Sequence, residues 1–308
     1  MAYRLKLGER VPQGIRRIVR EEIEAAARQL SGKGETDRDE AIHEARKNVK
    51  KIRGVLRLVR PELREIYGLE NSHFRGIGQQ LSHFRDAGAV IETFDALRRK
   101  HHGEMDGQVL SIVRRRLKAR KTQTEKHANI GEVLEGLAAT LRQSMERVGT
   151  WPLSTDGFAG IAPGLEATFR RGQRALARAR KHSSPESYHE WRKRVKDHWY
   201  HVRLLEAFWD GAMPAYERRL KDLETWLGED HNLVVLQETV MADPGFYGDE
   251  ADIGRLVRLI GEYHHELRDD ALKLGERIYA DKPRKFSGKM RHMWDNAQDK
   301  SSGPSKMG

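Results

Sequence analysis

Apolar residues recur three and four positions apart along most of the chain. This spacing places side chains on one face of an α-helix, whereas alternation of apolar and polar residues is typical of a half-buried β-strand. Period-two runs rich in Val, Ile and Thr are missing from the sequence. The pattern therefore predicts an all-α protein, with helices over residues 12–30, 37–60, 68–102, 105–148, 163–181, 185–208, 212–242 and 250–280.

An internal repeat is the most informative feature of the sequence. Shifting the chain by 146 residues aligns 43–50, HEARKNVK, with 189–196, HEWRKRVK, at six identities in eight positions. The same shift pairs Arg57 with Arg203 and Leu58 with Leu204. A repeat of this length indicates a duplicated domain, because solenoid repeats run only ~20–50 residues.

Each half of the repeat accounts for about four predicted helices. We therefore expect two four-helix bundles related by an approximate two-fold axis. The predicted units are an N-terminal bundle over residues 1–150 and a C-terminal bundle over residues 151–281. Residues 282–308 contain seven Lys or Arg among many Ser and Gly, so we expect a basic, disordered tail.

Composition narrows the chemistry. The chain has 308 residues, with 57 Lys and Arg against 46 Asp and Glu, and its net charge of +11 favours a polyanionic partner. It has no cysteine, which excludes thiolate catalysis, disulfides and cysteine-containing zinc sites. No run approaches the ~20 apolar residues of a membrane helix, and no apolar signal segment follows Met1. We therefore expect a cytoplasmic protein that does not enter a membrane.

The repeated segment carries cations on one helix face. His43, Arg46, Lys47, Lys50 and Arg57 fall within ~100° of arc, and an apolar stripe occupies a separate face. Like charges three and four residues apart repel one another on a helix. Such unrelieved repulsion is typical of a preformed anion site, since a bound polyanion removes it and releases counterions. The spacing suits a phosphate chain, which Arg binds bidentately and Lys binds as a point charge.

These residues resemble the conserved histidine α-helical domain, or CHAD, family. The resemblance rests on His-x-x-Arg-Lys-x-x-Lys in each half, at His43 to Lys50 and His189 to Lys196, and covers nearly all of residues 10–280. A turn motif of the family also matches at 81–86 and 227–232, although Ser82 replaces Gly and His231-Asn232 replaces Asn-Asp. Membership implies two four-helix bundles around a basic groove that binds inorganic polyphosphate without turnover. It also implies association with polyphosphate granules.

We expect both copies of the motif to contribute to one polyphosphate site. Arg16, Arg20, Arg170 and Arg174 belong to a second weak repeat and are expected to widen the cationic wall. The predicted binding residues are His43, Arg46, Lys47, Lys50, Arg57, His189, Arg192, Lys193, Lys196, Arg203, Arg16, Arg20, Arg170 and Arg174.

Several alternatives stay open at the level of sequence. The cationic stripe could be a solvated face, and either histidine could bond a neighbouring group. The same cations could contact the backbone of a nucleic acid, although the basic arc lacks aromatic residues for stacking. An enzyme acting on polyphosphate or triphosphate is disfavoured because no carboxylates are paired for metal-dependent chemistry. We predict no catalytic residues, no cofactor and no metal site, since Lys47 stands where His-Glu-x-x-His requires its second histidine.

Overall fold

The computed structural model describes residues 3–32, 38–126 and 130–301, without the side chains of 83–87, 124–126 and 301. Helices account for nearly all of these residues, and no strand occurs among them, which confirms the all-α prediction. The longer helices are α1 (Val11–Leu30), α2 (Arg38–Leu58), α4 (Ile66–Lys100), α5 (Gly107–Lys126), α6 (Ile130–Gly149), α7 (Ala162–His182), α8 (Pro185–Leu204), α9 (Met213–Met241), α11 (Glu250–Ile278) and α12 (Pro283–Ser301). Short elements are α3 (Arg60–Leu63), η1 (Phe158–Gly160), η2 (Glu206–Phe208) and α10 (Pro244–Tyr247).

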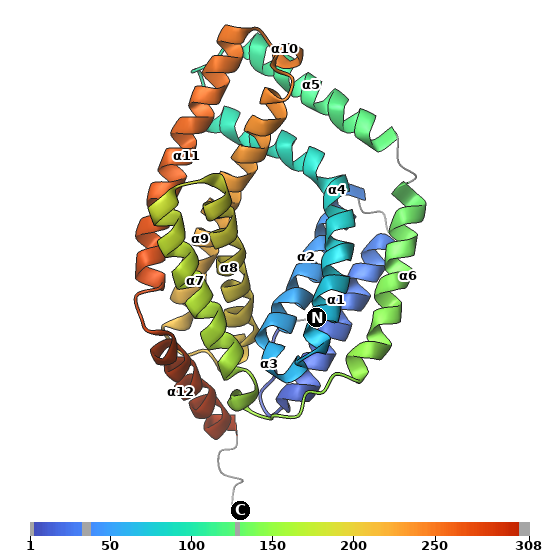
Figure 1. Cartoon of the computed structure of the whole chain (residues 1–308), viewed down its shortest axis with the longest axis vertical. Coiled ribbons are helices and arrows are strands. Elements are labelled where there is room, and N and C mark those ends of the chain that lie inside the picture. Colours follow the sequence, from blue (N-terminus) through green and yellow to red (C-terminus); the bar gives the residue numbers. More distant parts are fainter. Residues whose placement is uncertain (1–2, 33–37, 127–129, 302–308) are drawn as a thin grey trace, which may run out of the picture.

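The helices form two groups that meet along α2 and α8 (Figure 1). In one group α2 packs between α1 and α4, and in the other α8 packs between α7 and α9. The outer layers of the two groups differ, because the two helices α5 and α6 lie against α4 and α1, whereas one continuous helix, α11, lies mainly against α9. The predicted duplication and its two-fold axis therefore stay predictions.

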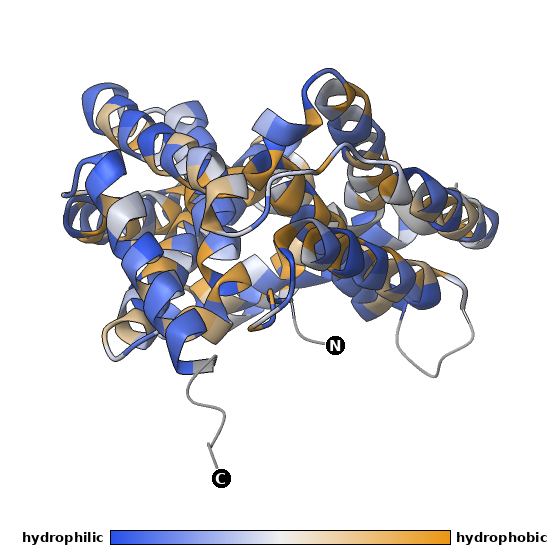
Figure 2. Cartoon of the chain, turned by 90° about the horizontal axis from the view of Figure 1, so that it is seen from below, coloured by the Kyte–Doolittle hydropathy of each residue, from blue (hydrophilic) through white to orange (hydrophobic). Residues whose placement is uncertain are grey.

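Two buried clusters hold the helices together, and each draws on both halves of the sequence. The larger cluster includes residues of α1, α2 and α6 together with α7, α8 and α12. The smaller one joins the C-terminal parts of α4 and α9 to α5, α10 and α11. Apolar positions gather where helices face one another (Figure 2). The long helices α4 and α9 run through both clusters, so residues 1–150 and 151–281 pack as partners.

The predicted single helix over residues 105–148 is wrong. The structure describes α5 and α6 there, and residues 127–129 between them lie outside the described residues. The two helices bury their apolar faces against different partners, since α5 packs on α4 and α10 whereas α6 runs along α1. A chain that covers both surfaces has to change direction (Figure 1).

The predicted disorder of residues 282–308 is also wrong over most of that segment. Helix α12 docks through Phe286, Met290, Met293 and Trp294, each at most 9% exposed. The Trp294 ring stacks on Phe208 with centroids 3.9 Å apart. Polar composition concealed this apolar stripe, whose spacing is that of one helix face. Residues 302–308 lie outside the described residues.

Candidate anion-binding site

A cavity of about 470 Å³ opens between α2, α4, α8 and α9. We call it the central cavity. Its described lining holds six Lys or Arg side chains against two glutamates, which leaves a net charge of +4 with the histidines neutral. The charged and histidine lining residues are His43, Arg46, Lys47, Lys50, Glu92, Arg192, Lys196, Lys221, Glu224 and His231.

The close approach of α2 and α8 brings the two repeated helix faces together. Gly54 of α2 lies under Tyr200 of α8, where a Cβ atom would come within 3.3 Å of the Tyr200 Cβ. Beside it, the His201 side chain places Nε2 2.8 Å from the Gly54 carbonyl oxygen. The apolar faces of both helices are buried, through Val49 on α2 and Val195 on α8. The opposite, cationic faces are therefore directed into a shared space.

Six of the predicted residues line the central cavity. Helix α2 contributes four of them and helix α8 contributes two. Lys47 and His43 are exposed at the rim, whereas Lys50, Arg192 and Lys196 are partly buried. The two motif copies thus meet in one cavity.

Two of these cations, Lys50 and Arg192, have no described acidic neighbour in direct contact to offset their positive charge. Lys50 and Arg192 make neither a hydrogen bond nor an ion pair with any residue that the structure describes. The Nε atom of Arg192 is buried without a hydrogen-bond partner. Burial lowers the pKa of Lys50 well below its ordinary value, and Lys196 and Arg46 lower it further. Burial likewise lowers the pKa of Arg192. An anion that enters the cavity would relieve both effects.

Glu224 of α9 is the buried acid of the cavity, at 5% exposure. Its carboxylate accepts hydrogen bonds from Lys196 at 2.8 Å and Lys221 at 2.7 Å. Burial alone would raise the pKa of Glu224, but these two ammonium groups outweigh it and hold the pKa at about 2. Glu224 is therefore ionised at neutral pH and offsets part of the cavity charge.

Two residues of the second motif copy line a neighbouring groove instead. This side groove of about 880 Å³ is lined by residues of α7, α8 and α9, with His189, two cations and three glutamates, namely Lys193, Arg178, Glu186, Glu190 and Glu238. It meets the central cavity at His231, which lines both. The His189 and His231 rings lie 4.1 Å apart between centroids. Burial and nearby cations lower the pKa of His189 to about 4 and that of His231 to about 3, so both rings are neutral at pH 7.

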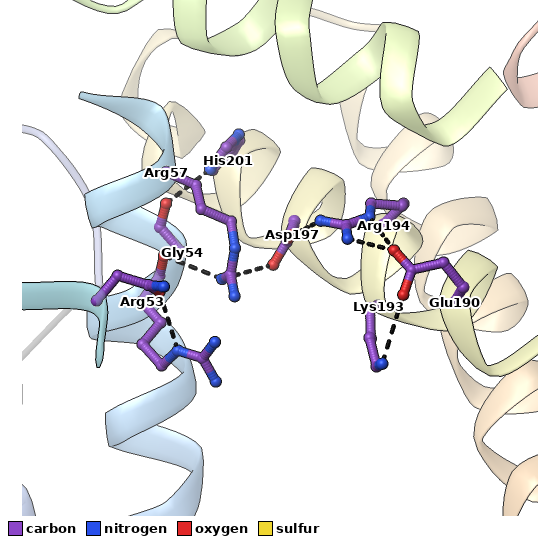
Figure 3. Close-up of polar contacts among 9 residues, drawn as sticks. Arg53, Gly54, Arg57, Glu190, Lys193, Arg194, Asp197 and His201 are labelled. Atoms are coloured by element: carbon purple, nitrogen blue, oxygen red, sulfur yellow. Dashed lines mark hydrogen bonds and ion pairs between the residues drawn. The ribbon is translucent and has the colours of Figure 1, made fainter. Parts of the chain in front are cut away.

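Arg57 does not line the central cavity, although it shares a helix face with Lys50. Its guanidinium donates to the Asp197 carboxylate at 2.9 Å, across the seam between α2 and α8 (Figure 3). Asp197 is 7% exposed and lies 3.6 Å from a second guanidinium, that of Arg194. Burial raises the pKa of Asp197, and the arginines oppose that rise. The structure thus assigns Arg57 to the contact between the two halves of the chain.

The remaining predicted cations also lie outside the central cavity. Arg16 donates to the Trp151 carbonyl at 2.6 Å and so anchors the segment after α6. Arg203 lies over the Trp199 ring, 5.5 Å from its centroid. The other three are exposed side chains of α1 and α7, namely Arg20, Arg170 and Arg174. The expected widening of the cationic wall by the second weak repeat is not seen in this cavity.

Sequence reasoning missed the contribution of α9. Lys221 and Glu224 line the cavity, and the 146-residue shift would have paired Lys221 with another cation, Arg75. No such signal marks Glu224, because the same shift pairs it with Gly78. The supposed turns at 81–86 and 227–232 are wrong as well, since both segments lie inside the continuous helices α4 and α9. The side chains of Arg85 and Asp86 lie outside the described residues.

The described residues offer one cluster that could hold a metal ion, and none of its members lines the central cavity. Donor atoms of His101, Glu104 and Glu262 lie within 4.8 Å of one another. His101 Nδ1 already lies 2.8 Å from a Glu104 oxygen, which accounts for that contact as a hydrogen bond. Among the described helices, none combines the length and apolar character needed to cross a membrane.

Comparisons with known proteins agree with this fold. The sequence matches the family described as CHAD domain over residues 17–240. The structure resembles the crystal structure of the CHAD domain from the plant Ricinus communis, with a TM-score of 0.59 and 17% sequence identity. That match covers 91% of this chain and 95% of the plant chain, and at this identity it shows the fold alone. No curated protein is significantly similar in sequence.

Proposed function

The chain belongs to the CHAD domain family, and on that premise we propose that its central cavity binds inorganic polyphosphate without turning it over. One observation carries the proposal. Lys50 from one motif copy and Arg192 from the other enter the same cavity with no described hydrogen-bond or ion-pair partner. Two partly buried cations in that condition cost folding free energy unless an anion joins them.

A phosphate chain matches this arrangement in charge and in shape. Each internal phosphate of the chain carries negative charge, and guanidinium and ammonium groups form strong charge-assisted hydrogen bonds with its oxygens. The side groove continues from the cavity at His231, but its two cations are outnumbered by the three glutamates Glu186, Glu190 and Glu238. The excess of positive charge therefore lies in the central cavity itself, and the match to a phosphate chain is made there.

The aromatic residues of the cavity favour polyphosphate over a nucleic acid. Trp199 and Tyr200 line it, yet they are only 8% and 3% exposed. The Lys221 ammonium lies 4.8 Å from the Trp199 ring centroid, and that of Lys196 lies 5.9 Å from the Tyr200 ring centroid. Rings so covered offer no open face on which a base could stack.

The buried acid of the cavity, Glu224, supports binding without turnover. Metal-assisted attack on a phosphoanhydride requires carboxylates that are available to ligate metal ions. Both oxygens of Glu224 accept hydrogen bonds from lysines. In this proposal the protein holds the chain in the cytoplasm, including on polyphosphate granules.

Charge-removing variants test the proposal in a titration with long-chain polyphosphate. Each of Lys50→Gln and Arg192→Gln should weaken binding about tenfold or more, since a hydrogen bond to a charged group contributes ~1.5–3 kcal/mol. Arg174→Gln removes the same charge from an exposed position of α7 outside the cavity and should change the affinity by less than about twofold.

Equal losses in all three variants would mean that the ligand responds to net charge alone, and the proposal would fail. Duplex DNA that displaces polyphosphate at equal phosphate concentration would establish the nucleic-acid alternative. Release of orthophosphate by the purified protein with Mg²⁺ or Mn²⁺ would overturn the absence of turnover.

A further inference from the structure

Glu224 places a negative charge inside a cavity that otherwise gathers cations. We propose that Glu224 is a specificity-determining residue, an internal counter-anion that excludes small free phosphates and so favours a long polyphosphate chain. This inference rests on the proposed function.

The carboxylate divides the cations of the cavity into two sets. Lys196 and Lys221 are engaged by Glu224 on α9, through contacts of 2.8 and 2.7 Å. Lys50 and Arg192 have no such described partner, and among the described residues Lys47 pairs with Glu44 of its own helix at 3.1 Å. An incoming anion therefore finds part of the cavity charge already neutralised.

A small phosphate meets this arrangement at a disadvantage. Orthophosphate or pyrophosphate reaches only the few cations within its own length, and Glu224 lies among them. Repulsion between two anions a few ångströms apart is poorly screened in a partly buried site. The small ligand has no further contacts with which to offset that repulsion.

A long chain meets the same carboxylate with many more contacts. Its phosphates can reach Lys47, Lys50 and Arg192 of the cavity at the same time, because the chain spans more of the lining than a small phosphate does. Each additional contact is made at high effective concentration once the first has formed, and each releases counterions. One repulsive group therefore lowers the affinity of a long chain by a smaller factor.

The opposing interpretation is that Glu224 only positions its two lysines. Removal of the carboxylate would then let Lys196 and Lys221 move apart, and every anion would bind more weakly. The two interpretations predict opposite signs for the affinity of a small anion. They can therefore be separated by one substitution.

The test is Glu224→Gln, titrated with pyrophosphate and with long-chain polyphosphate at one salt concentration. We expect the affinity for pyrophosphate to rise about tenfold and that for the long chain to rise less than about threefold, so that selectivity falls. Glu22→Gln is the matched control, because Glu22 is also buried, at 7% exposure, and pairs with a lysine, Lys51, at 3.0 Å, but lies outside the cavity. It should leave the ratio of affinities unchanged.

A second variant serves if Glu224→Gln does not fold. Lys221→Gln removes an exposed cation and leaves Glu224 with one lysine partner, so it should weaken pyrophosphate binding by a larger factor than long-chain binding. An unchanged ratio, or weaker binding of both ligands to Glu224→Gln, overturns the inference while the proposed function stands. Failure of the unmodified protein to bind the long chain overturns the proposed function itself.

Discussion

Lys50 and Arg57 lie about two turns apart on α2, yet their surroundings differ. Lys50 enters the central cavity, whereas Arg57 bonds Asp197 of α8. A helical wheel predicts both on one face and does so correctly. It contains no information on which neighbouring helix each position meets, so it could not separate a ligand contact from an ion pair between helices.

We predict that Arg57→Ala destabilises the fold and leaves the binding site intact. Loss of one partner from a buried ion pair typically costs ~3–5 kcal/mol, and we expect about 3 kcal/mol because Arg194 stays near Asp197. Urea denaturation measures the loss, and titration of the folded variant with polyphosphate should show an affinity within about twofold of the original. Weaker binding of polyphosphate by a variant of unaltered stability would instead show that Arg57 contributes to the binding site.

Glu224 shows the limit of sequence reasoning at this scale. Glu224 and Lys221 lie on α9, outside both copies of the repeated motif, and reach the cavity only because α9 packs on α8. A repeat identifies residues that recur in both copies. A residue that acts on one side alone, such as Glu224, leaves no such mark.

Among the elements, α12 is the one for which composition misled. The segment from Lys282 onward is polar and basic, but its four large apolar side chains follow helical spacing and join the larger buried cluster, where α12 packs against α7 and η2. Seven of the eight predicted helices, by contrast, lie close to observed ones. The helical spacing of apolar residues therefore predicted helices better than the composition of a segment did. It was wrong between α5 and α6, where the apolar face changes its packing partner.

Removal of the Phe286 ring tests the docking of α12. This ring stacks on Phe169 with centroids 4.5 Å apart and is 5% exposed. We expect Phe286→Ala to lower the free energy of unfolding by ~3–5 kcal/mol in chemical denaturation. Arg284 is an exposed residue within one turn of Phe286 on the same helix. Arg284→Ala should therefore change the free energy of unfolding by less than about 0.5 kcal/mol. Equal stability of the two variants would mean that α12 adds nothing to the core.

At the scale of the whole molecule, the sequence predicted the convergence of the two cationic helices better than it predicted the division of the chain into bundles. Two amphipathic helices with the same cationic face were expected to converge, and α2 and α8 do so. The expected division into two bundles is less visible, since both buried clusters join the two halves. Long-range packing of α4 with α9 could not be inferred from either half alone.

The buried histidines predict loss of stability in mild acid. Burial lowers the pKa of His198 to about 3 and that of His201 to about 4, below the ordinary value of about 6.5 that the unfolded chain regains. The unfolded state therefore binds protons first, and stability falls as the pH drops below about 6.5.

Between pH 7 and pH 5 the expected loss is about 2 kcal/mol for each of these two histidines. Chemical denaturation at the two pH values measures it. His201→Gln keeps a side-chain N–H group near the Gly54 carbonyl but does not titrate, so it should reduce the pH effect by about 2 kcal/mol, the contribution of one histidine. Constant stability from pH 7 to pH 5 would contradict the assignment of neutral, buried rings.

A crystal structure of the protein with a short polyphosphate chain would test the central claim most directly. The measurement is the distance from the phosphate oxygens to Lys50 Nζ and to the Arg192 guanidinium. We predict that one continuous chain lies in the central cavity, with oxygens about 2.7–2.9 Å from both groups. Phosphates found only on the outer faces of the helices, with none between Lys50 and Arg192, would contradict the account.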